Sequence, residues 1–305
     1  LGGDEFTIIL NGIKDKKDAT IVARKIKNAI KKLIIIDDHE IFISTSIGIV
    51  LFSNENDVPE TLIKHADMAL YAAKEKSRGT YAYYEEKMDI SVTNRINMIN
   101  DLRFALDRHE FELYYQPQID LGSGKLIGME ALLRWRHPKL GLLSPSKFIP
   151  LLEETGLIVE IGDWVLLEAC RQNCLWQKEN LAELRVAINL SSRQFHQKCL
   201  LKCIKKVLNK TNLSPKYLQI EVTESTLMTN CHESIVVLNE LCDLGVQSSI
   251  DDFGTGFSSL SYLRLFPFKA LKIDRSFVKE IATQGNVEKI MTAVITLAHS
   301  LDMKV

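Results

Sequence analysis

From about residue 110 to its end, the chain alternates short apolar segments with helical segments, and this alternation limits the possible folds most. The apolar segments include "RVAINLS" (185–191), "YLQIEVTE" (217–224), "VQSSIDD" (246–252) and "ALKIDRSFV" (270–278). They recur about every 20 to 30 residues, close to the ~30 residues of one strand–helix unit in a (β/α)₈ barrel. Repeated strand–helix units predict a parallel sheet covered by helices. We therefore expect an α/β, TIM-type barrel over residues 109–305.

Residues 1–86 follow a different pattern, which is typical of an α+β domain. "EFTIIL" (5–10), "IFISTSIGIVLF" (41–52) and "YAYYEE" (81–86) predict strands, because they are rich in β-branched and aromatic residues. The segments between them have helical periodicity. Residues 87–108 predict a helix that connects this domain to the barrel.

Polar residues occupy one face of the predicted barrel strands, near their carboxyl ends. Because side chains alternate faces along a strand, Glu221 lies opposite Ile220 and Val222, and Glu130 shares a face with Arg134. The carboxyl ends of barrel strands form one mouth, where the active sites of TIM barrels lie. We expect these side chains to converge there: Glu130, Asn189, Glu221, Asp251, Asp252 and Lys272.

Such a cluster combines four carboxylates with one amide, and the carboxylates would repel one another without cations between them. Ligands that are all oxygen favour hard divalent ions, here Mg²⁺ or Mn²⁺. Acidic clusters of this kind often hold two metal ions for phosphoester cleavage, so we expect two. Two simpler interpretations stay open. The aspartates of "SSIDDFGTG" could cap a helix, and Lys272 could be an ion-pair partner of Glu221 or Asp274.

The composition argues against several classes of protein. A formal net charge of -1 gives no bulk attraction to nucleic-acid polymers or anionic membranes. No apolar run approaches the ~18 residues of a membrane span, and no signal peptide opens the chain. We expect a cytoplasmic location, with any membrane anchor in segments outside this sequence. Cys170 and Cys174 lie four residues apart, as do Cys199 and Cys203, but without a neighbouring His or CxxC pair this favours reduced thiols over zinc.

The motifs "YYQP", "EALLRW", "NLS", "EVTES", "DDFGTG" and "LKID" occur in this order and resemble the motif series of the EAL domain. EAL domains are cyclic-di-GMP phosphodiesterases with a TIM-barrel-like fold. The resemblance implies hydrolysis of cyclic-di-GMP to linear pGpG, with metal ligands at Glu130, Asn189, Glu221, Asp251 and Asp252. It also implies that Lys272 positions or polarises the attacking water. Glu224 would support the loop after Asp252, and Arg134 and Gln116 would contact the dinucleotide.

The opening "GGDEF", followed by "SIGIV" and "ADMALYAAKEKSRG", resembles the GGDEF domain, a diguanylate cyclase with a cyclase/ferredoxin-like fold. The resemblance implies nucleotide approach at Gly2 and Gly3, metal binding by Asp4 with Glu5 in support, and triphosphate contacts from Lys74 and Arg78. GTP is then an expected ligand. The "SRG" of this chain stands where the family usually has "GRN". The simpler interpretation of "GGDEF" is a hairpin turn with acidic residues.

Compared with the two family patterns, we expect the chain to be truncated at both ends. Part of the GGDEF nucleotide site would precede residue 1, and the EAL pattern continues beyond Val305 with a Glu and a Gln near the site. We therefore expect this fragment, without the last barrel strands, to be inactive alone and the full-length protein to be the enzyme.

Two other functions stay open for the complete protein. One is a catalytically silent receptor for cyclic-di-GMP, which loss of a metal ligand would favour, although none of the visible ligands is lost. The other is a diguanylate cyclase with a vestigial EAL barrel, which the intact "GGDEF" keeps open. A homodimer is expected from the resemblance, because EAL domains commonly pair through the barrel.

Overall fold

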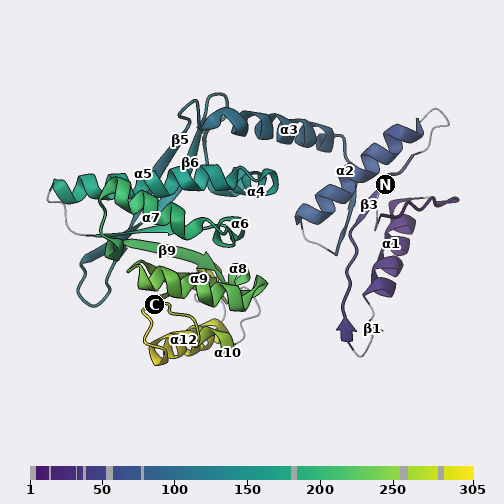
Figure 1. The fold of residues 1–305 in the computed structure, drawn as a ribbon. Helices are drawn as coiled ribbons and strands as arrows, with labels where there is room; N and C mark the ends of the chain where they lie inside the picture. The colour runs from purple at the N-terminus through teal and green to yellow at the C-terminus, as the bar shows by residue number, and fades with distance from the viewer. Residues whose placement is uncertain are drawn as a thin grey trace. The chain divides into compact units, whose positions relative to one another are not determined.

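The computed structural model describes the chain except for residues 1–4, 14, 32, 37–38, 53–57, 77–78, 180–183, 255–259 and 281–284. The backbone divides into two compact units, Leu1–Met98 and Ile99–Val305. The division falls within the long helix α3 (Lys87–Ala105), which begins where the predicted connecting helix begins (Figure 1).

Within its described residues, the first unit contains two helices, the first part of α3 and two pairs of short strands. Strand β1 (Ile34–Ile36) pairs antiparallel with β2 (His39–Ile41), and β3 (Ile47–Ile49) pairs parallel with β4 (Tyr81–Tyr83). The helices are α1 (Lys16–Ile30) and α2 (Pro59–Lys76).

Local contacts explain where α1 begins and why α2 packs closely on its neighbour. The side chain of Asp15 caps α1 by accepting a hydrogen bond from the backbone nitrogen of Lys17 at 2.7 Å. Helix α2 packs closely on β3, because a Cβ atom at Gly48 would lie only 2.0 Å from the carbonyl oxygen of Ala66. Glycine is therefore needed at position 48 for the two backbones to approach.

Two strand predictions in this unit are wrong. Residues 5–10 form no strand, and Phe6 and Ile9 are 88% and 75% exposed. Within 41–52, only Ile41 and Ile47–Ile49 lie in strands. A β-branched sequence becomes a strand only where a neighbouring backbone accepts and donates its hydrogen bonds, and the sequence pattern does not reveal whether that neighbour exists.

The second unit is built around one sheet, whose main order is β11-β10-β9-β8-β6-β5 with β7 paired to β6. The strands are β5 (Phe111–Ile119), β6 (Leu126–His137), β7 (Gly141–Leu143), β8 (Arg185–Asn189), β9 (Leu218–Thr223), β10 (Gln247–Phe253) and β11 (Ala270–Ile273). Neighbours from β6 through β8, β9 and β10 to β11 run parallel, as predicted.

The first strand pair departs from the parallel prediction, since β5 runs antiparallel to β6. The two strands are joined by a tight turn in which Asp120 accepts a hydrogen bond from the backbone of Ser123 at 2.8 Å. Gly124 takes a positive φ of 66° in the same turn. A connection this short can join only antiparallel strands, because a parallel pair needs a long crossover.

Helices pack on the sheet, and their order across it follows the order of the strands (Figure 1). The helices are α4 (Pro145–Thr155), α5 (Ile158–Lys178), α6 (Ser192–Phe195), α7 (Leu200–Thr211), the 3₁₀ helix η1 (Pro215–Tyr217), α8 (Glu224–Thr229), α9 (Cys231–Asp243), α10 (Leu260–Leu263), α11 (Arg275–Glu280) and α12 (Gly285–Ser300). Helix α5 packs on β8 and α7, α7 packs on α9, and α9 packs on β10. Buried strand residues such as Val186, Ile188 and Ile250 form the core under this layer.

Within the described residues the sheet is open, with β5 and β11 at its two ends. Lys304 forms a parallel bridge beside Ala270, and its carbonyl oxygen accepts a hydrogen bond from the nitrogen of Leu271 at 2.7 Å. The sheet, which is parallel from β6 to β11, and its helices give the α/β architecture expected from the sequence. None of the helices that the structure describes is long and apolar enough to cross a bilayer.

Candidate active site and metal centre

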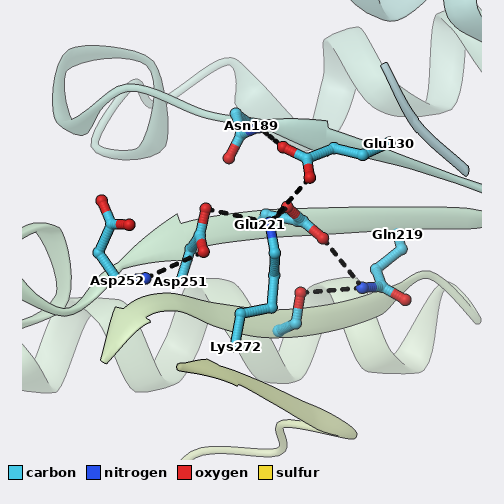
Figure 2. A network of polar contacts seen from close by, with 8 residues as sticks. Glu130, Asn189, Gln219, Glu221, Asp251, Asp252 and Lys272 are labelled. Carbon is cyan, nitrogen blue, oxygen red and sulfur yellow. Dashed lines mark hydrogen bonds and ion pairs between the residues drawn. The ribbon is translucent and has the colours of Figure 1, made fainter. Parts of the chain in front are cut away.

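Five polar side chains from five different strands meet on one face of the sheet (Figure 2), four of them near the carboxyl end of their strand and Glu130 in the first half of the long β6. The residues are Glu130 on β6, Asn189 on β8, Glu221 on β9, Asp251 on β10 and Lys272 on β11. The parallel register sets Asn189 directly beside Glu221, and it sets Asp251 beside Thr223, two residues further along β9. Neighbouring parallel strands thus bring distant residues to one face.

The ammonium group of Lys272 lies at the centre of the cluster. Its Nζ atom donates to Glu130 Oε2 at 3.1 Å and to Asp251 Oδ2 at 3.2 Å, and it makes a close contact with Glu221 Oε2. One carboxylate oxygen from each of the three acids lies within 4.8 Å of the others. Of the two partners suggested by the sequence, Lys272 pairs with Glu221, whereas Asp274 accepts hydrogen bonds from Ser276.

The electrostatics of the cluster are dominated by the burial of Glu221, whose side chain has no exposed surface. Burial raises its pKa to about 7, because Lys272 offsets only part of the desolvation and the charges of Glu130 and Asp251 oppose ionisation. Burial by itself would lower the pKa of Lys272, but the three carboxylates more than compensate and raise it. One permanent positive charge therefore faces three acids.

Asn189 and Asp252 lie at the rim of this cluster. Asn189 Nδ2 donates to Glu130 Oε1 at 2.7 Å, so the other polar atom of the amide is its carbonyl oxygen, the atom that ligates metals. The backbone nitrogen of Asp252 donates to Asp251 Oδ1 at 2.9 Å. Asp252 has a φ of 52°, and partial burial together with the charge of Asp251 raises its pKa.

The donor set suits hard divalent cations. It consists of carboxylate and amide oxygens, which Mg²⁺ and Mn²⁺ prefer, and it contains no sulfur or imidazole. One carboxylate oxygen from each of Glu130, Glu221 and Asp251 lies within 4.8 Å of the others, the grouping expected of a cation site. Burial is the main cause of the raised pKa of Glu221, and the charges of Glu130 and Asp251 add to it. Lys272 neutralises only one of the three carboxylates, so additional cations would favour the charged form of Glu221.

Glu224 follows β9 directly and is almost completely buried, at 2% exposed. Its Oε2 atom accepts a hydrogen bond from the backbone nitrogen of Gly254 at 3.2 Å. Its Oε1 atom is buried and has no hydrogen-bond partner within the part of the chain that the structure describes. Gly254 takes a φ of 97°, and a Cβ atom there would lie 2.8 Å from the ring of Phe277. Glu224 therefore holds the first residue of the segment that follows β10.

Arg134 and Gln116 lie on the strands next to the cluster and outside its hydrogen-bond network. Gln116 on β5 is the cross-strand partner of Glu130 and is exposed. Arg134 lies four residues after Glu130 on the same face, donates to the carbonyl oxygen of Leu133 at 2.8 Å, and stands over the ring of Tyr114 at 5.4 Å. Both side chains flank the cluster on its β5–β6 side.

Of the residues predicted for a second nucleotide site, the structure describes only Glu5 and Lys74. Glu5 is exposed in a segment without regular structure, and Lys74 is exposed on α2. Gly2, Gly3, Asp4 and Arg78 lie outside the described residues.

The cysteine pairs make contacts that suit reduced thiols. Cys170 is fully buried, and burial raises its pKa to about 12. Cys203 Sγ donates to Asp163 Oδ1 at 3.1 Å, and Cys174 Sγ donates to the carbonyl oxygen of Thr211 at 3.2 Å.

Two residues that the sequence analysis missed lie beneath the cluster. Gln219 Nε2 donates to Glu221 Oε1 at 3.3 Å and to Ser249 Oγ at 2.9 Å (Figure 2). The sequence did contain a signal for both residues, since they precede Glu221 and Asp251 by two positions and alternation puts them on the same face of the sheet as those acids. Neither residue type is acidic or basic, so neither stood out as a candidate.

Comparison with known protein families matches residues 99–305 to the EAL domain. The chain belongs to the EAL domain family. Residues 1–80 match the diguanylate cyclase GGDEF domain, so the EAL domain follows a GGDEF segment in this chain, as the motifs predicted.

Two curated relatives share this tandem region with the EAL chain. This chain is 42% identical over 305 residues to the bifunctional diguanylate cyclase/cyclic di-GMP phosphodiesterase MucR of Pseudomonas aeruginosa. It is 45% identical over 306 residues to the signaling protein YkoW of Bacillus subtilis. Each match covers 100% of this chain but only 44% and 38% of the relative, so the chain spans less than half the length of either protein.

The EAL domain also resembles a solved structure of the PaMucR phosphodiesterase in complex with c-di-GMP. The two are 46% identical with a TM-score of 0.67, and the match covers 68% of this chain and 84% of the other. This supports the TIM-type fold expected for the second unit.

Proposed function

We propose that the protein containing this chain hydrolyses cyclic-di-GMP to linear pGpG at the carboxylate cluster, with two Mg²⁺ or Mn²⁺ ions. The observation that carries the proposal is the convergence of Glu130, Glu221 and Asp251 around Lys272. The similarity to MucR, which is named as a cyclic di-GMP phosphodiesterase, supports cyclic-di-GMP as the substrate.

Five side chains would hold the ions: Glu130, Asn189, Glu221, Asp251 and Asp252. When bound, the divalent ions would neutralise phosphate charge and make a water molecule more acidic. The chain contributes the arrangement: Glu130 and Asn189 are already joined by a 2.7 Å hydrogen bond, so their oxygen ligands are oriented before an ion arrives.

Lys272 would act as a positioning and polarising cation. Its raised pKa keeps it charged at neutral pH, so it cannot accept a proton from the acids. Its three N–H groups face three carboxylates, so it would donate to an attacking water in place of one of those contacts. The carboxylates are then the groups in the cluster that can accept a proton. Burial raises the pKa of Glu221 to about 7, which makes it suited to accept a proton near neutral pH.

The flanking residues would orient the dinucleotide. Arg134 carries a permanent charge beside the cluster, suitable for a phosphate, and the exposed amide of Gln116 is suitable for a hydrogen bond to the substrate. Glu224 would keep the segment after Asp252 in place through its bond to Gly254. Homodimerisation and binding of GTP by the GGDEF segment are parts of the same proposal that rest on family resemblance.

The test is product analysis with the full-length protein. Cyclic-di-GMP is incubated with Mg²⁺ or Mn²⁺, and GTP is incubated separately. We expect pGpG from the first reaction, and its formation should stop with a chelator and in Glu221→Gln. Glu112→Gln is the matched control, because Glu112 pairs with Arg136 away from the cluster.

Other outcomes identify the alternatives. Binding of cyclic-di-GMP without turnover would indicate a receptor. Cyclic-di-GMP made from GTP, with no pGpG from the first reaction, would indicate a cyclase with a vestigial barrel. Either result refutes the proposed hydrolase.

A further inference from the structure

Gln219 and Ser249 form a polar layer directly beneath the carboxylate cluster. Gln219 precedes Glu221 by two residues on β9, and Ser249 precedes Asp251 by two on β10, so both share the face of the cluster. Gln219 is 6% exposed and Ser249 has no exposed surface.

The two N–H groups of the Gln219 amide have different partners. One donates to Ser249 Oγ at 2.9 Å, and the other points to Glu221 Oε1 at 3.3 Å (Figure 2). The reverse orientation of the amide would set its carbonyl oxygen against a carboxylate oxygen, which is unfavourable. The carboxylate of Glu221 therefore determines which way the amide faces, and the Ser249 hydroxyl accepts the other N–H.

These contacts divide the two oxygens of Glu221 between two partners. Gln219 holds Oε1, and Lys272 holds Oε2 on the side of Glu130 and Asp251. A glutamate has three rotatable side-chain bonds, so contacts at both oxygens limit it to one orientation. Residues that hold a metal ligand in this way commonly affect metal affinity about 10- to 100-fold.

A purely space-filling role explains the amide poorly. A buried amide costs free energy unless it is hydrogen-bonded, and a leucine of similar size would fill the same volume without needing partners. Resting on the proposed function, we infer that Gln219, held by Ser249, is a positioning residue that orients the Glu221 carboxylate for divalent-cation binding.

The test measures Mn²⁺ binding to the substrate-free, full-length protein by calorimetry. We expect Gln219→Leu to raise the Kd for Mn²⁺ about tenfold or more. Ser249→Ala should raise it less. The double variant should match Gln219→Leu alone, because Ser249 acts only through Gln219.

The matched control is Ser248→Ala. Ser248 is a buried serine on the same strand at 3% exposed, but alternation directs it to the opposite face. Its Kd for Mn²⁺ should stay within twofold of wild type. The same variants are then compared for hydrolysis. Gln219→Leu should require a higher Mn²⁺ concentration, and excess Mn²⁺ should largely restore its activity.

Clear outcomes overturn the inference. A Gln219→Leu protein that folds normally by circular dichroism and binds Mn²⁺ like wild type refutes it. If Gln219→Leu does not fold, equal Kd values for Ser249→Ala and Ser248→Ala refute it. A wild-type protein that binds no Mn²⁺ would overturn the proposed function as well, which separates the two failures.

Discussion

At the scale of single residues, Glu221 shows most clearly what the site requires. It is a carboxylate without exposed surface beside one ammonium group and two further acids. Such a group is stable in its charged form only if more positive charge is supplied. The site is therefore expected to be under electrostatic stress when no metal is bound.

The first prediction concerns the pH dependence of stability in a chelating buffer. The folded protein keeps the Glu221 proton up to about pH 7, while the unfolded chain releases it near its ordinary value of 4.5. Between these values the folded state binds more protons, so raising the pH lowers the free energy of unfolding, by about 3 kcal/mol in total. Urea denaturation from pH 4.5 to 8 measures this loss, and Glu221→Gln should remove most of it. An unchanged pH dependence in that variant would contradict the assignment.

The second prediction concerns metal linkage. Because Mn²⁺ or Mg²⁺ would bind the folded cluster and not the unfolded chain, an ion at 100 times its Kd should raise the free energy of unfolding by about 2.7 kcal/mol. Asp251→Asn should lose most of this increment at the same ion concentration. Glu112→Gln should keep it, since its acid lies outside the cluster. Denaturation with and without the ion measures the increment, and equal increments in both variants would argue against the site.

At the scale of elements, the N-cap of the helix that follows β8 lies two residues after Asn189. Helix α6 begins with a capping box, in which Ser191 accepts from the backbone nitrogen of Gln194 while the Gln194 side chain accepts from that of Ser191. Helix α5 approaches this cap closely, because a Cβ atom at Gly162 would lie 1.8 Å from Gln194 Nε2. The cap and the close approach are thus coupled.

The third prediction follows from this contact. Gly162→Ala should displace Gln194, break the capping box and destabilise the protein by roughly 1 to 3 kcal/mol. Gly122→Ala is the control, since a Cβ there meets only Asp120 Oδ2, at an ordinary 3.6 Å. Chemical denaturation of both variants measures the difference. Equal stabilities would show that Gln194 can move without cost.

At the scale of the whole molecule, the two units differ in the quality of their cores. Among the side chains that the structure describes in the first unit, the buried apolar ones are mostly alanines, namely Ala19, Ala23, Ala69 and Ala73, with Met68. The second unit buries large side chains, among them Trp135, Phe148, Phe195, Leu218 and Ile220. Because buried area determines hydrophobic stabilisation, the units should differ in local stability.

The fourth prediction is a hydrogen-exchange pattern. Amides of β8, β9 and the first half of β10 should exchange slowest, because these strands have neighbours on both sides and a buried core. Amides of β3 and β4 should exchange much faster. Mass spectrometry of labelled peptides checks the order, and equally slow exchange in β3 and β4 would show that the first unit is more stable than its core suggests.

The sequence alone determined the α/β class, the parallel order of the later strands and the shared face of Glu130, Glu221 and Asp251, because alternation along a strand and repeated strand–helix units are local patterns. It did not determine that β5 is antiparallel, that residues 5–10 lack a strand, or that Gln219 and Ser249 support Glu221. Only the tertiary structure decided these, along with the contact of Lys272 with three carboxylates. The physical reason is that such features depend on which strands become neighbours and in what register, and residues far apart in the chain set both.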